Sequence, residues 1–304
     1  METTQSRKVE MSFERIISNL DFQNRQFCLD LPLINLYLKT VRKYYPDLKK
    51  TLGSYFVPPL VRDQDSVSSH YERIWEIDNE DFVRARDNRR DIFLIGKRPV
   101  YTDGWFIIKS YTELLLNVIN QLGVDSVLEV GSGRGNNLSL LALRRPDIKF
   151  CGLELTHAGV KASRDLVENL PQKYLTVSGF KGMTTQQREA LGKIQFFQAS
   201  ALEMPFPNNS FDFSFTCLVL EQMPHYYIQV LQEIRRVTRK YCVFIEPFAE
   251  ANNFFGIAYL RSVDYFRASY KFFADIGMEP IYFTTDFPQK LRFKAGLLIA
   301  RIVR

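Results

Sequence analysis

The pattern of apolar and polar positions changes character near residue 122. From residue 125 onward, short β-rich apolar runs alternate with segments of helical periodicity. The predicted strands cover 126–130, 148–155, 194–197, 211–217 and 241–245, and the predicted helices cover 138–143, 158–170 and 226–238. Because parallel strands need crossover connections, this alternation predicts an α/β fold with a parallel sheet and helices on both faces.

Two further strand-like runs lie near the C-terminus, at 280–284 and 293–303. Only residues 285–292 separate them, which is too short for a helical crossover. We therefore expect an antiparallel hairpin that closes the parallel sheet.

The first hundred residues have a different pattern. Apolar positions recur at helical spacing from Leu33 to Tyr45, and Pro46 ends that segment. Residues 51–70 are mixed in character and suggest a loop, whereas 105–122 again has helical periodicity and is closed by Gly123. We divide the chain into a mainly helical N-terminal extension, 1–104, which we expect to contribute to a substrate pocket or a lid, and a domain at 105–304.

Composition narrows the class of protein. With 46% hydrophobic and 24% charged residues, the 304-residue chain has enough apolar surface for a core, and its apolar runs are far shorter than a membrane span. The N-terminus lacks the pattern of a secretory signal. The four cysteines, Cys28, Cys151, Cys217 and Cys242, form no C-x-x-C pair, so we expect free thiols and a cytoplasmic location.

Charge and histidine content add two expectations. The net charge of +6 comes from scattered basic pairs, which favours solvated helix faces over a nucleic-acid or membrane patch. Three histidines and no clustered cysteines give no credible metal site.

The first strand of the alternating region runs into a glycine-rich turn, Glu129-Val130-Gly131-Ser132-Gly133-Arg134-Gly135. Glycines here permit positive φ and a close approach of ligand to backbone. The turn lacks the third glycine of a G-x-G-x-x-G dinucleotide motif, and the chain has no P-loop. Glu154 ends the second strand, where a carboxylate can accept hydrogen bonds from both ribose hydroxyls of a nucleoside.

Together, the acid before the glycines, the glycines and the acid after the second strand resemble the class I S-adenosylmethionine-dependent methyltransferases. Segments 200–212, 220–225 and 233–237 resemble further motifs of the UbiE/type 11 group in the expected order, so the resemblance covers about 105–304. It implies a Rossmann-like seven-stranded sheet and S-adenosyl-L-methionine as cofactor. The cofactor-binding residues that it implies are Glu129, Gly131, Ser132, Gly133, Glu154, Leu155, Ser200, Ala201 and Cys217.

Three departures from the family pattern concern the details of the site. The family usually has Asp where Ser200 stands and His where Gln222 stands. Arg239-Lys240-Tyr241 replaces a Gly-Gly turn before the fifth strand. A neutral serine oxygen accepts a hydrogen bond more weakly than a carboxylate does.

Methyl transfer depends mainly on alignment, so a general base is optional. His225 and Glu246 follow the fourth and fifth strands at the sheet edge where ligands gather, and they are our candidates for catalytic residues. An aromatic-rich segment, 252–273, is either a helix packed on the sheet or a lid over an acceptor.

The sequence excludes some classes of methyl acceptor. Residues 216–219 lack the Asn/Asp-Pro-Pro-Tyr/Phe loop of enzymes that methylate adenine or glutamine amides. A small-molecule or sugar hydroxyl, or an amine, remains. The alternatives to a methyltransferase are a non-catalytic nucleoside-binding module, which Ser200 favours, and a nucleotide-dependent oxidoreductase, which the glycine spacing disfavours. The oligomeric state stays open.

Overall fold

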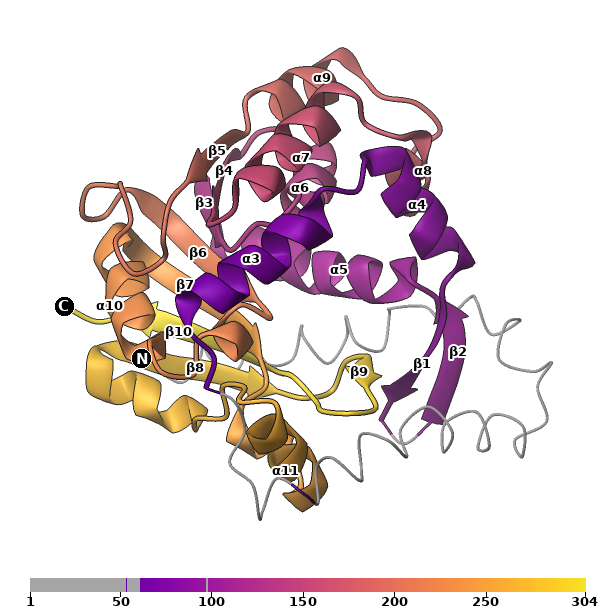
Figure 1. Cartoon of the computed structure of the whole chain (residues 1–304). Helices are drawn as coiled ribbons and strands as arrows, with labels where there is room; N and C mark the ends of the chain where they lie inside the picture. The colour runs from indigo at the N-terminus through magenta and orange to yellow at the C-terminus, as the bar shows by residue number, and fades with distance from the viewer. Residues whose placement is uncertain (1–52, 54–60, 97) are drawn as a thin grey trace.

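The structure is a computed structural model in which residues 53, 61–96 and 98–304 are described. The apolar helix predicted over 33–45 lies outside these residues. Within the described ranges, no helix is both long and apolar enough to cross a membrane. The described fold consists of a large mixed sheet with flanking helices and a small second sheet (Figure 1).

The large sheet has seven strands in the order β5-β4-β3-β6-β7-β10-β8 (Figure 1). Its strands are β3 (Ser126–Val130), β4 (Lys149–Glu154), β5 (Gln195–Gln198), β6 (Phe211–Cys217), β7 (Thr238–Glu246), β8 (Met278–Thr284) and β10 (Gly296–Ile302). The strands β3 to β7 pair in parallel, whereas β10 lies antiparallel between β7 and β8. The Rossmann-like sheet with an antiparallel C-terminal hairpin is thus confirmed.

Helices cover both faces of this sheet. The helices after residue 104 are α5 (Trp105–Leu122), α6 (Asn136–Arg144), α7 (His157–Glu168), α8 (Gln172–Val177), α9 (Thr185–Gly192), α10 (Tyr227–Val237) and α11 (Phe254–Ser262), with 3-10 turns at Leu220–Gln222, Ala249–Ala251 and Tyr270–Ile276. As predicted, α5 ends at Gly123, whose φ of 58° is left-handed. The pattern analysis missed α8 and α9, although Thr184 and Gln187 form a capping box at the start of α9.

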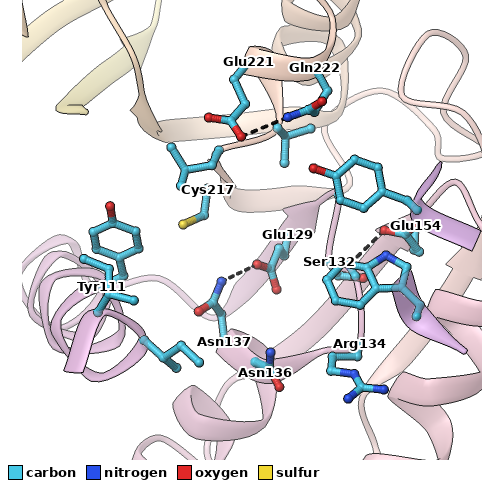
Figure 2. Close-up of a pocket in the computed structure, with 18 of the residues that line it drawn as sticks. Tyr111, Glu129, Ser132, Arg134, Asn136, Asn137, Glu154, Cys217, Glu221 and Gln222 are labelled. Carbon is cyan, nitrogen blue, oxygen red and sulfur yellow. Dashed lines mark hydrogen bonds between the residues drawn. The ribbon is translucent and has the colours of Figure 1, made fainter. Parts of the chain in front are cut away.

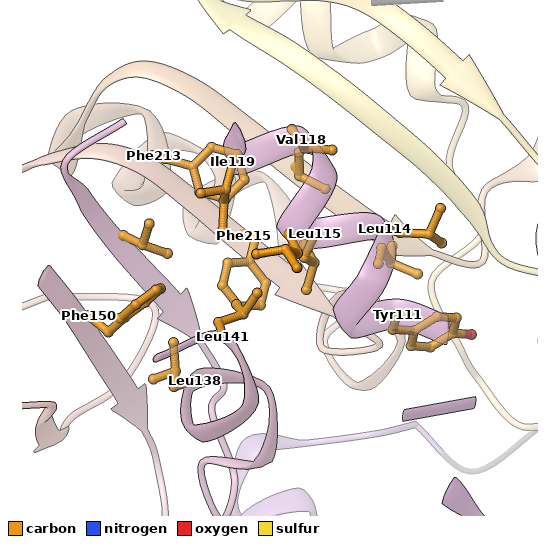
Figure 3. Packing of buried hydrophobic residues seen from close by; sticks show 14 of the residues in the cluster. Tyr111, Leu114, Leu115, Val118, Ile119, Leu138, Leu141, Phe150, Phe213 and Phe215 are labelled. Carbon is orange, nitrogen blue, oxygen red and sulfur yellow. The ribbon is translucent and has the colours of Figure 1, made fainter. Parts of the chain in front are cut away.

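The core fixes the sheet edge that carries the candidate site. On one face, buried side chains of α5 pack against α6 and the strands (Figure 3). The labelled members of this cluster are Tyr111, Leu114, Leu115, Val118, Ile119, Leu138, Leu141, Phe150, Phe213 and Phe215. On the other face, the apolar stripe of α10 packs on β7 and β10. Burial on both faces explains why the parallel strands are nearly continuous apolar runs.

The described residues before α5 form two helices and a hairpin. These elements are α3 (Gln64–Trp75), α4 (Asn79–Asn88), β1 (Arg90–Ile95) and β2 (Arg98–Asp103). The hairpin joins β9 (Gln289–Lys290) in a three-stranded sheet. The strand predicted at 293–303 is observed at 296–302, where β10 pairs with β7 and β8. The loop expected over 51–70 is wrong from Gln64 onward, because Asp63 caps α3 by accepting from the Ser66 N–H.

Candidate functional site

A cavity of about 590 Å³ opens at the carboxyl ends of β3, β4 and β6 (Figure 2). This is the edge at which open α/β sheets bind their ligands. The glycine turn and the β6–α10 loop line it from the sheet side. Aromatic side chains of other elements also line it, namely Tyr71, Trp75, Phe93, Tyr111, Tyr259, Tyr265 and Phe293. The cavity is thus lined by the sheet edge together with α3, α5 and the segments around α11 and β9.

The glycine turn is shaped by close contacts. Gly131, Gly133 and Gly135 have φ values of 74°, 53° and 74°, a region that residues with a Cβ rarely adopt. A Cβ on Gly131 would lie 2.5 Å from a Val219 methyl carbon, and one on Gly133 would lie 2.8 Å from the Trp75 ring. Both glycines are therefore required by the packing as well as by the backbone conformation.

Glu154 links the glycine turn to the start of α7. Its Oε2 accepts from the Gly133 N–H at 2.9 Å, and its Oε1 accepts from the Thr156 N–H and hydroxyl at 3.0 and 2.6 Å. The carboxylate lines the cavity and is held rigidly there. Carboxylate oxygens have about four lone-pair sites, so Glu154 can still accept from a ligand hydroxyl.

Glu129, at the end of β3, is buried beside the same turn (Figure 2). Its Oε1 accepts from Asn137 Nδ2 at 2.7 Å, and its Oε2 has no hydrogen-bond partner among the described residues. Burial raises the pKa of Glu129 to about 8, although the hydrogen bond from Asn137 opposes this. A buried carboxylate with a free oxygen is costly to ionise unless a cation approaches it, so Glu129 can hold a positively charged group.

The β6–α10 loop carries a second buried carboxylate, Glu221, which lines the cavity. Glu246 holds the backbone of this loop: its Oε1 accepts from the Val219 N–H at 2.9 Å, and its Oε2 accepts from the Glu221 N–H at 3.3 Å. Glu246 is completely buried and is not on the cavity wall. Burial, followed by the charge of Glu221, raises the pKa of Glu246 to about 8.

The other predicted site residues are divided between the cavity and its surroundings. Leu155, Ala201 and Cys217 line the cavity, as do Gly131, Ser132 and Gly133. Ser200 is not among the lining residues; its hydroxyl accepts from Gln64 Nε2 of α3 at 3.0 Å. His225 also lies off the wall, with Nε2 2.8 Å from Asp264 Oδ2.

Helix α3 is the feature of the site that the sequence did not indicate. It has no buried residue, yet it spans from Ser200 to the N-terminus of α7, where Glu72 accepts from the Ala158 N–H at 2.9 Å. Tyr71 and Trp75 of α3 line the cavity. The half-buried face of α3 recurs at helical spacing through Val67, Tyr71 and Trp75, so this spacing and the cap at Asp63 and Ser66 are the sequence signals that could have revealed it.

These residues fit a nucleoside with a positively charged tail. Glu154 can accept from ribose hydroxyls, and the free oxygen of Glu129 suits an ammonium group. A carboxylate in the position of Glu154 serves the ribose of a dinucleotide equally well, but the free oxygen of Glu129 beside the glycine turn favours a cation over a pyrophosphate. S-adenosylmethionine therefore fits this set of acceptors.

Comparisons with known proteins agree with this geometry. A family model described as a methyltransferase domain, type 11, matches residues 128–245. The crystal structure of the [4+2]-cyclase SpnF is similar at a TM-score of 0.56 and 15% identity, over 81% of this chain and 98% of SpnF, which shows a shared fold.

Two other similar structures match less of the chain. Geranyl diphosphate C-methyltransferase from Streptomyces coelicolor A3(2) matches at a TM-score of 0.42 and 12% identity, over 59% of this chain and 70% of that enzyme. The PH0226 protein from Pyrococcus horikoshii OT3 matches at a TM-score of 0.45 and 12% identity, over 64% of this chain and 89% of that protein. No curated protein matches the sequence. Residues 128–245 therefore form a class I S-adenosylmethionine-dependent methyltransferase domain of the type 11 group, and the fold of the described chain agrees with this.

Proposed function

We propose that this methyltransferase acts on a hydroxyl or amine of a small molecule. The observation that carries the proposal is the cavity, whose volume of about 590 Å³ is typical of small-molecule sites and which α3 borders on the side away from the sheet. A cytoplasmic location is also proposed, in keeping with the free thiols Cys151, Cys217 and Cys242.

The proposed cofactor site consists of the residues that the family motif implies. Glu154 accepts from the ribose, Glu129 faces the ammonium of the methionine part, and Gly131, Ser132 and Gly133 leave room for close approach. Leu155, Ala201 and Cys217 border the nucleoside and the reacting end. Ser200 comes to this site only if its bond to Gln64 is exchanged.

When bound, S-adenosylmethionine supplies a methyl group on a positively charged sulfur, which the acceptor atom displaces. The chain contributes alignment and exclusion of water, which can provide much of the rate enhancement of such a displacement. Tyr71 and Trp75 of α3 and Phe93 of β1 contribute to the enclosing wall, which supports an acceptor-pocket role for the N-terminal extension. His225 and Glu246 stand outside the wall and remain proposed only as positioning residues.

A second function, a module that binds the cofactor without catalysis, is the alternative. Ser200 at the family's usual Asp position favours it, and SpnF, a cyclase, has the same fold. The methyltransferase and the non-catalytic module differ in whether a methyl group is transferred from S-adenosylmethionine to an acceptor.

The proposal is tested with methyl-labelled S-adenosylmethionine and a cell extract separated by size. We expect label to enter the low-mass fraction only when the full chain is added. Label in protein or nucleic acid would contradict a small-molecule acceptor. If the protein binds S-adenosylhomocysteine but transfers no labelled methyl group to any fraction, the non-catalytic module is favoured.

A further inference from the structure

One buried carboxylate on the cavity wall has no part in the proposed cofactor site. Glu221 is only 6% exposed, and three tyrosines from separate parts of the fold line the same cavity: Tyr71 of α3, Tyr111 of α5 and Tyr265 after α11. Burial raises the pKa of both Tyr71 and Tyr265, and the charge of Glu221 is the next largest cause in each. The tyrosine hydroxyls therefore lie within electrostatic reach of this carboxylate.

The position of Glu221 is fixed by its backbone. Its N–H donates to Glu246, and its carbonyl accepts from the Phe266 N–H at 3.3 Å. Its side chain is only half satisfied: Oε1 accepts from Gln222 Nε2 at 2.9 Å, whereas Oε2 has no partner among the described residues (Figure 2). Such a group is rigidly placed and still able to accept a hydrogen bond.

The nearby cations do not form an ion pair with it. In the described part of the chain, no ammonium or guanidinium nitrogen lies within 4 Å of the Glu221 carboxylate. Arg62 donates instead to Gln222 Oε1 at 2.7 Å and to the Val263 carbonyl at 2.9 Å. The Lys290 ammonium lies 5.4 Å from the centre of the Phe293 ring. Both cations lower the pKa of Glu221 against the effect of burial.

We propose that Glu221, with Tyr71, Tyr111 and Tyr265, forms the acceptor subsite, and that the acceptor is an amine bound as its ammonium form. An ammonium compensates both the free lone pair and the buried charge of Glu221, whereas a neutral hydroxyl compensates only the lone pair. Aromatic walls around a carboxylate are a setting in which organic cations bind well. This inference rests on the proposed small-molecule function.

The Glu221 carboxylate can also accept the proton that the bound ammonium must lose. An ammonium must lose one proton before its nitrogen can attack, and the free Oε2 of Glu221, which has no part in the proposed cofactor site, can accept it. The nitrogen then gains the methyl carbon, and the electron pair of the broken sulfur–carbon bond stays on sulfur. Atoms and charges balance without a further reactant.

The subsite is tested with 2-(dimethylamino)ethanol, which is protonated at neutral pH, and 3-methylbutan-1-ol, which have the same shape and differ in the charged N–H group. Each is titrated calorimetrically into the full chain saturated with S-adenosylhomocysteine. We expect the amine to bind about tenfold or more tighter than the alcohol, and Glu221→Gln to reduce that preference to within about twofold. Asp91→Asn is the matched control, because it removes a wall carboxylate that is already paired with Arg89 at 3.2 Å.

Equal binding of the two probes to the unmodified chain, absence of amine binding, or a preference that survives in Glu221→Gln would overturn the amine subsite. Loss of the preference in Asp91→Asn to the same extent would overturn it too. Melting curves establish that the variants are folded. Binding of S-adenosylhomocysteine, recorded in the same samples, tests the cofactor site separately, so failure of the subsite and failure of the methyltransferase site are distinguishable.

Discussion

Changing Glu154→Ala is expected to weaken S-adenosylhomocysteine binding by about tenfold to a few hundredfold. A hydrogen bond to a charged group contributes about 1.5–3 kcal/mol, and 1.4 kcal/mol corresponds to tenfold in affinity. The variant loses the proposed acceptor of the ribose hydroxyls and also frees the Gly133 and Thr156 N–H groups that shape the turn. Calorimetry gives the affinity, and a melting curve gives the cost to the fold.

Glu154→Gln separates these two contributions. The amide oxygen of the substituted side chain can still accept hydrogen bonds, whereas its NH₂ group cannot. Part of the affinity for S-adenosylhomocysteine should therefore be retained. If Glu154→Ala lowers the melting temperature but leaves affinity within about twofold, Glu154 only ties the turn to α7, and the proposed ribose contact is wrong.

The second large effect is on stability. Glu246→Ala is expected to cost about 2–4 kcal/mol of unfolding free energy, because it leaves the buried Val219 and Glu221 N–H groups unpaired and opens a cavity. For a domain of this size, each kcal/mol corresponds to a fall of roughly 2–4 °C in melting temperature. Thermal and urea unfolding measure it.

The pH dependence of stability supplies a check on the same residue. The pKa of Glu246 is about 8 in the fold and 4.5 for an unperturbed carboxyl, so the folded state binds the extra proton between these values. Its contribution to stability is therefore greatest at low pH and falls as pH rises toward 8. The slope should be smaller in Glu246→Ala. A variant with unchanged stability but no turnover would instead place Glu246 at the acceptor.

The strands and the glycine turn were predictable from sequence because their signals are local. Buried parallel strands are short apolar runs, and the spacing of Gly131, Gly133 and Glu154 directly reflects a backbone conformation and a sheet edge. The C-terminal hairpin was predictable from the short link. The pairing of Gln289 and Lys290 with β1 was not predictable, because β1 is nearly two hundred residues away in sequence.

The side chains around the cavity depend on tertiary contacts and were harder to predict. His225 and Glu246 follow strands, which indicated the sheet edge at which they lie but not where their side chains point. The His225 ring contacts Asp264, and the Glu246 carboxylate binds the backbone of the β6–α10 loop. The contribution of Tyr71 and Trp75 depends on where α3 docks, which is set by hydrogen bonds to Ser200 and Ala158, both far away in sequence.

The central claim is that the crevice at β3, β4 and β6 binds S-adenosylmethionine with its ammonium beside Glu129. The most direct measurement is calorimetric titration of S-adenosylhomocysteine near pH 7 in two buffers of different ionisation enthalpy, with NAD and methylthioadenosine as controls. Because the pKa of Glu129 is about 8, a cation at its Oε2 should lower that pKa and release a proton. We expect one site for S-adenosylhomocysteine with proton release approaching one, no release with methylthioadenosine, which lacks the amino-acid part, and no binding of NAD. Binding of NAD without binding of S-adenosylhomocysteine would contradict the account.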